Sequence, residues 1–153
     1  MKNFNPAKFI ATFFYLGCFP LAAGSFASLA GALVWVFWGE QPGLYLGVLA
    51  VAVALGFLTG GRVERMLGKK DPACVVMDEF AGVLIAFFAL PFSPAVFWSA
   101  FFLFRAFDMF KIYPANKFEV SPGSVGIMMD DIVAGLYTNI VMQVALLLVS
   151  FSR

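Results

Sequence analysis

The sequence predicts an all-α membrane protein: a polytopic bundle of about four to five spans, preceded by a re-entrant or interfacial N-terminal segment. Hydrophobic residues make up 62% of the 153 residues, and 20 residues are Phe. Charged residues make up only 12%, about half of the roughly 25% that is usual in soluble domains. A soluble domain of this length could not bury so much apolar surface. At roughly 20 residues per span, the apolar residues suffice for four or five membrane helices.

The apolar segments alternate with Pro, Gly and charged residues, and these breaks set the expected elements. The first segment, residues 9–19, is too short to cross a membrane comfortably and ends at Pro20. The spans that follow are expected at residues 25–38, 44–61, 78–90, 95–110 and 132–151. Turns at residues 39–43 and 91–94, and polar loops at residues 62–74 and 113–125, separate them. No repeat or linker is visible, so we expect a single domain over residues 1–153.

The basic residues indicate which side of the membrane the loops face. They gather at the two long loops, as Arg62, Arg65, Lys69, Lys70, Lys111 and Lys117. The two short turns contain neither Lys nor Arg. Because positive residues are enriched in cytoplasmic loops, both long loops are expected to face the cytoplasm.

The composition also excludes several kinds of chemistry. The chain contains no histidine, which removes a Ser-His-Asp triad and a histidine-ligated zinc site. Cys18 and Cys74 are too few for a thiolate metal cluster. The net charge of +1 gives no sign of a nucleic-acid partner. Any catalysis must therefore use carboxylates, hydroxyls, backbone amides and a hard cation.

Five acids abut or enter apolar segments: Asp78, Glu79, Asp108, Asp130 and Asp131. Asp78 lies 13 residues before Pro91, and Asp108 lies 14 residues after Pro94. At 1.5 Å per helical residue, both are roughly 20 Å from the turn between these prolines. Asp130 and Asp131 open the last span on the same side. We therefore expect the acids to meet at one level near the cytoplasmic boundary. The acids in loops, among them Glu64 and Asp71, need no special role.

Two simpler explanations stay open for these acids. An Asp at a helix N-terminus accepts backbone N–H bonds, which would suit Asp78, Asp130 or Asp131 taken singly. Asp108 lies near a helix C-terminus and has Arg105 and Lys111 on its own helical face as pairing partners. Neither explanation accounts for the convergence of several costly intramembrane carboxylates. A hard-cation site accounts for it, and Mg²⁺ is the usual occupant of such sites.

Two glycine-containing segments precede helices on this side. Gly123 and Gly126 lie in a loop that leads into a helix start, where backbone N–H groups can bind phosphate. Gly24 and Ser25 open another helix. An ordinary turn is the alternative for the first segment, and a small-residue packing contact is the alternative for the second.

Three segments together resemble the phosphatidylglycerophosphatase A family of bacterial membrane lipid phosphatases. They are Val76-Met77-Asp78-Glu79-Phe80-Ala81-Gly82, Phe104-Arg105-Ala106-Phe107-Asp108-Met109-Phe110-Lys111-Ile112-Tyr113-Pro114 and Gly126-Ile127-Met128-Met129-Asp130-Asp131-Ile132-Val133-Ala134-Gly135. Nearly all of the family's patterns occur here in order. The early glycine segment departs from the family, because Ala23-Gly24-Ser25 stands where Pro-Gly-Thr is usual.

The resemblance implies Mg²⁺-dependent hydrolysis of the terminal phosphomonoester of phosphatidylglycerophosphate to phosphatidylglycerol and phosphate. It also implies a multi-pass protein of the bacterial inner membrane, with its site at the cytoplasmic face. Such a site suits the substrate, whose acyl chains lie in the bilayer while its headgroup lies at the interface.

The corresponding hypothesis assigns each residue a role. Asp78, Glu79, Asp108 and Asp131 hold Mg²⁺, and Asp130 is the base that orients water, a role that Glu79 could exchange with it. Arg105 and Lys111 bind the phosphates. Gly24, Ser25, Gly123 and Gly126 supply further donors to the substrate.

Two functions of other classes remain open. A small ion or proton carrier could also keep intramembrane carboxylates, although a carrier is expected to place them near the bilayer midplane. A non-catalytic membrane subunit is the other alternative. The sequence does not determine the oligomeric state, or whether residues 9–19 cross the membrane.

Overall fold

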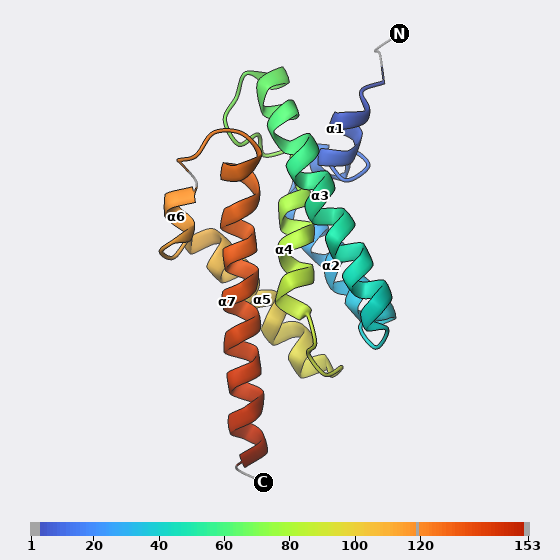
Figure 1. Ribbon diagram of the computed structural model, residues 1–153, viewed down its shortest axis with the longest axis vertical. Coiled ribbons are helices and arrows are strands. Elements are labelled where there is room, and N and C mark those ends of the chain that lie inside the picture. Colours follow the sequence, from blue (N-terminus) through green and yellow to red (C-terminus); the bar gives the residue numbers. More distant parts are fainter. Residues whose placement is uncertain (1–3, 119, 152–153) are drawn as a thin grey trace.

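The computed structural model describes residues 4–118 and 120–151, and within them every regular element is helical (Figure 1). The elements are α1 (Pro6–Ala11), the one-turn 3-10 helix η1 (Leu16–Cys18), α2 (Ala23–Trp38), α3 (Pro42–Leu67), α4 (Met77–Phe87), α5 (Pro94–Phe110), α6 (Ala115–Phe118) and α7 (Ser124–Phe151). The all-α prediction is therefore confirmed for this part of the chain.

Two helices, α3 and α7, are long and apolar enough to cross a membrane. Only 28% of the most apolar window of each helix is buried inside the protein, so neither is the buried core helix of a soluble fold. The lower half of α7 extends beyond its neighbours in Figure 1, and its exposed residues include Leu147 and Leu148. Such a large exposed apolar surface is typical of contact with lipid. The chain thus has the features of a membrane protein.

Four to five spans were predicted, but only two of the described helices are long enough to cross a membrane. The helices α2, α4 and α5 contain 16, 11 and 17 residues, fewer than the roughly 20 that a perpendicular span requires. The boundary of α3 also differs from the prediction, because this helix continues to Leu67. Arg62 and Arg65, predicted in a loop, therefore lie in its last two turns.

The N-terminal segment at residues 9–19 does not form one continuous helix. It contains the end of α1 and the short η1, joined by a reversal in which Phe13, Phe14 and Tyr15 all have positive φ. At 1.5 Å per residue, the six residues of α1 span only about 9 Å.

The short helix α4 lies at the centre of the bundle, where it packs against α2, α3, α5 and α7 (Figure 1). It ends at Phe87, and two side chains of α7 bind the carbonyl groups left free there. The Asn139 amide donates to the carbonyls of Ala86 (3.1 Å) and Phe88 (2.7 Å), and Gln143 donates to that of Ala89 (3.3 Å). These bonds supply the partners that the end of a helix needs away from water.

Candidate functional site

An acidic cavity of about 320 Å³ lies between the N-terminal ends of α2 and α4, the C-terminal end of α5 and the third turn of α7. Its charged lining consists of Asp71, Asp78, Glu79, Asp108, Asp130 and Asp131 together with Arg105 and Lys111. The structure thus brings together all five acids that the sequence singled out. Six carboxylates face two cationic side chains, so the cavity carries an excess of negative charge when its groups are ionised.

Asp78, Glu79 and Asp131 form the closest group in this cavity. Each offers one carboxylate oxygen, and these oxygens all lie within 4.8 Å of one another. Asp78 Oδ1, Glu79 Oε2 and Asp131 Oδ1 are fully buried and have no hydrogen-bond partner within the described residues. Because a buried polar atom normally has a partner, three unpartnered oxygens on three neighbouring carboxylates indicate a ligand that the protein itself does not supply.

A close crossing of α4 and α7 brings two of these acids together. A β-carbon at Gly82 would lie 2.8 Å from the Asp131 carbonyl oxygen, and one at Gly135 would overlap the Gly82 carbonyl. Asp78 lies four residues before Gly82, and Asp131 lies four residues before Gly135, so each acid is one turn along from the contact on the same helical face. Gly82 and Gly135 allow the backbones of α4 and α7 to touch, and this contact sets the separation of Asp78 and Asp131.

The carboxylates of this group are largely removed from water. Asp78 is 8% exposed and Asp131 is 2% exposed. Buried carboxylates that lie beside one another either retain protons or are neutralised by a cation.

Arg105 is held by contacts with two helices. Its guanidinium forms an ion pair with Asp108 at 2.7 Å, within α5, and donates to the Ser28 hydroxyl of α2 at 3.4 Å. Of the two partners that the sequence suggested for Asp108, the structure therefore shows Arg105. Asp108 still lines the acidic cavity, although it is not one of the three closest carboxylates.

Lys111 pairs with a different acid. Its ammonium lies 2.7 Å from Asp130 Oδ2, which joins the end of α5 to α7. The second oxygen of Asp130 accepts from the backbone N–H of Asp131 at 3.1 Å. Lys111 itself is the C-cap of α5 with φ 44°, so the helix ends at the residue that pairs with Asp130.

The four predicted small residues are divided between two places. Gly24 and Ser25 line the acidic cavity, and a β-carbon at Gly24 would overlap Glu79 Oε1. Gly123 and Gly126 do not line it. Gly123 donates its N–H to Glu64 at 2.9 Å, and Gly126 lies against the backbone of Ser121. A role for these two in substrate binding stays a prediction.

The helix-capping explanation is wrong for the acids of α7. This helix begins at Ser124, so Asp130 and Asp131 lie inside it rather than at its start. Asp78 lies in the first turn of α4, but no side chain caps that helix, and Asp78 Oδ1 has no partner.

Three functional candidates were not identified from the sequence. Asp71 lines the acidic cavity, Ser28 contacts Arg105, and Glu64 accepts from the backbone N–H groups of Gly123 and, at 3.4 Å, of Asp71. Asp71 and Glu64 were expected to need no special role. Both were predicted in a loop, and nothing in the sequence marks either of them as part of a site. Asp71 reaches the other acids only through the tertiary fold.

The donor set fits a hard divalent cation. Its members are carboxylate oxygens without a histidine or cysteine ligand, which is the set that Mg²⁺ prefers. The three unpartnered oxygens could coordinate such a cation, and the excess of carboxylates would balance its charge.

Comparison with known proteins gives a consistent result. The sequence model of the phosphatidylglycerophosphatase A family matches residues 9–146 of this chain. A protein of Escherichia coli named phosphatidylglycerophosphatase A is 34% identical over 89% of this chain and 81% of its own length. A protein of Haemophilus influenzae with the same name is 35% identical over 90% of this chain and 86% of its own length.

A third relative has a different name. A protein of Bacteroides thetaiotaomicron, provisionally named phosphatidylinositol-3-phosphatase, is 35% identical over 89% of this chain and 91% of its own length. No solved structure matches the chain.

Proposed function

The chain belongs to the phosphatidylglycerophosphatase A family, and we propose that it hydrolyses the terminal phosphomonoester of phosphatidylglycerophosphate to phosphatidylglycerol and phosphate. The single observation that carries this proposal is the acidic cavity, where three unpartnered carboxylate oxygens lie beside Arg105 and Lys111. A metal-dependent phosphatase uses such a pairing of cation ligands with phosphate-binding groups.

Mg²⁺ is the proposed cofactor, held by Asp78, Glu79 and Asp131 with Asp108 at the edge of the site. When bound, it would supply charge neutralisation for the phosphate oxygens and for the leaving alkoxide. This requirement follows from the charge of the cavity, because six carboxylates against two cationic groups would repel a phosphate.

Arg105 and Lys111 are the proposed phosphate-binding residues. The guanidinium of Arg105 is oriented by Asp108 and Ser28, so its remaining N–H groups are available in a fixed direction for phosphate oxygens. Lys111 carries a compact charge at the mouth of the cavity. Gly24 and Ser25, in the first turn of α2, add backbone or hydroxyl donors.

Asp130 is the proposed base, with Glu79 as the alternative. Asp130 Oδ2 contacts Lys111 and Oδ1 accepts from Asp131 N–H, which fixes the orientation of the carboxylate. A water molecule beside it would donate a proton to this oriented group as it attacks phosphorus.

We further propose that the protein is a multi-pass protein of the bacterial inner membrane, with the acidic cavity at the cytoplasmic face. The basic residues near the ends of α3 and α5 support this orientation. The shorter helices α2, α4 and α5 would complete the four to five spans by partial insertion, or by local thinning of the bilayer, beside α3 and α7.

A second substrate follows from the Bacteroides relative, whose name specifies a phosphatidylinositol 3-phosphate phosphatase. Both lipids present a phosphomonoester on a polar headgroup, so the same cation and phosphate ligands would serve. They differ in the group that carries the phosphate, which is a glycerol in one lipid and an inositol ring in the other, and the residues around Gly24 and Ser25 would have to accommodate it.

The test is phosphate release by the purified protein in detergent micelles from each of the two lipids, with Mg²⁺ and with EDTA. The proposal expects release from phosphatidylglycerophosphate that EDTA abolishes and Mg²⁺ restores. Preferential release from phosphatidylinositol 3-phosphate would change the substrate. No release from either lipid would favour an ion or proton carrier or a non-catalytic subunit.

A further inference from the structure

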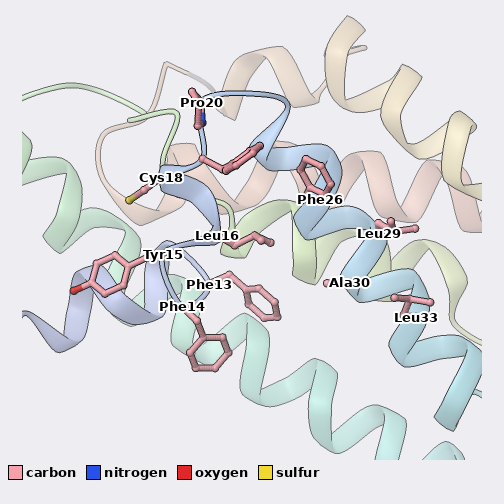
Figure 2. A pocket seen from close by; sticks show the side chains of 11 residues that line it. Phe13, Phe14, Tyr15, Leu16, Cys18, Pro20, Phe26, Leu29, Ala30 and Leu33 are labelled. Carbon is pink, nitrogen blue, oxygen red and sulfur yellow. The ribbon is translucent and has the colours of Figure 1, made fainter.

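A second cavity, of about 640 Å³ and almost entirely apolar, lies beside α2 (Figure 2). Phe13, Phe14 and Leu16 of the N-terminal segment line one side of it, and Phe26, Leu29, Ala30 and Leu33 of α2 line the other. Several of these side chains are exposed, including Phe14 and Phe26. The volume is within the usual range for a ligand site, roughly 300–1,000 Å³.

The helix α2 separates this apolar cavity from the acidic cavity. Gly24 and Ser28 lie one turn apart and face Glu79 and Arg105, respectively. At 100° per residue, the positions that line the apolar cavity lie on a different face of the helix.

The linings of the two cavities adjoin in the sequence at the start of α2. Phe19, Pro20 and Phe26 line the apolar cavity, whereas residues 22–25, between them in the sequence, line the acidic one. One short segment, residues 19–26, therefore borders both cavities.

We propose that the apolar cavity holds an acyl chain of the lipid whose phosphate group lies in the acidic cavity. This inference rests on the proposed function and specifies how the substrate is positioned. An amphiphile with an anionic head and a hydrocarbon tail is complementary to the pair of cavities, since Arg105 and Lys111 mark the anionic end and aromatic side chains mark the other.

The dimensions of the cavity agree with this occupant. From Gly24 to Leu33, α2 advances nine residues, or about 14 Å along its axis. This is close to the depth of one leaflet, which is half of the roughly 30 Å hydrocarbon core. A chain that lies along α2 would therefore extend from the headgroup level toward the middle of the bilayer.

The expected benefit is orientation rather than affinity. Lipid tails gain little by leaving a bilayer for an equally apolar surface. A chain fixed beside α2 would instead hold the headgroup in register with Arg105 and the carboxylates, and correct positioning contributes strongly to rate.

The first experiment fills the cavity with an Ala30→Trp variant. Phosphate release is measured with dioleoyl and dihexanoyl phosphatidylglycerophosphate in micelles. We expect kcat/KM to fall about tenfold more for the long-chain lipid than for the short-chain one, which corresponds to about 1.4 kcal/mol. Ala54→Trp is the matched control, because Ala54 is exposed on α3 and lines neither cavity.

An unchanged ratio between the two lipids in Ala30→Trp would overturn the proposal, as would an equal change in Ala54→Trp. Ala30→Leu adds less volume and serves if the Trp variant does not fold. It should shift the ratio in the same direction by a smaller factor.

The second experiment does not depend on turnover. Phosphatidylglycerophosphate with a diazirine in one acyl chain is photolysed immediately after mixing, and cross-linked peptides are identified by mass spectrometry. Phosphatidylcholine with the same chain is the control lipid. We expect cross-links at residues 26–33 that are several times more abundant with the phosphomonoester lipid and that Arg105→Ala reduces to the control level.

Equal cross-linking by both lipids would show ordinary boundary lipid and would overturn the proposal. Cross-links from the phosphomonoester lipid concentrated on α3, beside the neighbouring apolar cavity that Leu44 and Leu55 line, would also overturn it. Selective cross-links at residues 26–33 without phosphate release would support the chain site while contradicting the proposed function.

Discussion

Gly24 lies directly against Glu79, because the first turn of α2 approaches α4 so closely that a β-carbon at position 24 would overlap the Glu79 carboxylate. The same β-carbon would lie 3.5 Å from Arg105 Nη1. An alanine at this position would therefore have to displace the Glu79 carboxylate.

Gly24→Ala should therefore reduce phosphate release by about tenfold or more, since a displacement of the order of 1 Å near reacting groups has effects of this size. The measurement is kcat and KM with phosphatidylglycerophosphate. Gly47→Ala is the matched control, because a β-carbon at Gly47 on α3 would meet nothing within 4 Å. It should leave activity unchanged and stabilise the helix by up to about 1 kcal/mol. Full activity in Gly24→Ala would contradict the tight contact.

Removing the charge of Asp78 or Asp131 should nearly abolish Mg²⁺-dependent phosphate release while leaving the protein folded. Asp78→Asn and Asp131→Asn keep the shape of each side chain but remove a cation ligand, so phosphate release should fall more than about a hundredfold. Mg²⁺ titration of any residual activity should show weaker binding. Glu40→Gln, an exposed acid in the turn between α2 and α3, is the control. Normal turnover in either Asn variant would remove that acid from the site.

Arg105→Lys should raise KM more than it lowers kcat, because a single ammonium cannot retain the contacts with Asp108 and Ser28 while also presenting a planar fork to phosphate. We expect a rise of about tenfold in KM from steady-state phosphate release. Arg65→Lys changes an exposed arginine in the last turn of α3 and should have no effect. A KM equal to that of the wild type would indicate that Arg105 is only the partner of Asp108.

Asn139→Leu should destabilise the fold without altering the site chemistry. The Asn139 amide donates to the carbonyls of Ala86 and Phe88 at the end of α4, and a carbonyl that loses its partner in a membrane, away from water, costs about 1–3 kcal/mol. The thermal midpoint in detergent should fall, while activity well below that midpoint is retained. Gln143→Leu removes a single, longer bond from an exposed side chain and should have a smaller effect. Equal midpoints for wild type and Asn139→Leu would contradict this role.

The acids meet in one cavity, as predicted, although one of the reasons given for their meeting was wrong. Asp78 and Asp108 were placed at one level by counting from the turn at residues 91–94, and both line the acidic cavity. Asp130 and Asp131 were expected to open a span, yet α7 begins at Ser124 and places them in its interior. Counting gives a distance along a helix axis, whereas the start of this helix depends on tertiary contacts of its first residue, such as the hydrogen bond from the Gly61 N–H to the Ser124 hydroxyl.

Composition and order alone determined the helical class, the absence of histidine chemistry and the gathering of acids toward one end of the helices. Only the tertiary structure decided that Asp78, Glu79 and Asp131 are the closest three, that Asp108 and Asp130 instead pair with Arg105 and Lys111, and that Asp71 joins them. The physical reason is the rotation of each helix about its axis. A helix that is apolar on all sides carries little information about which face it turns inward, and here the backbone contact of Gly82 with Gly135 fixes that rotation.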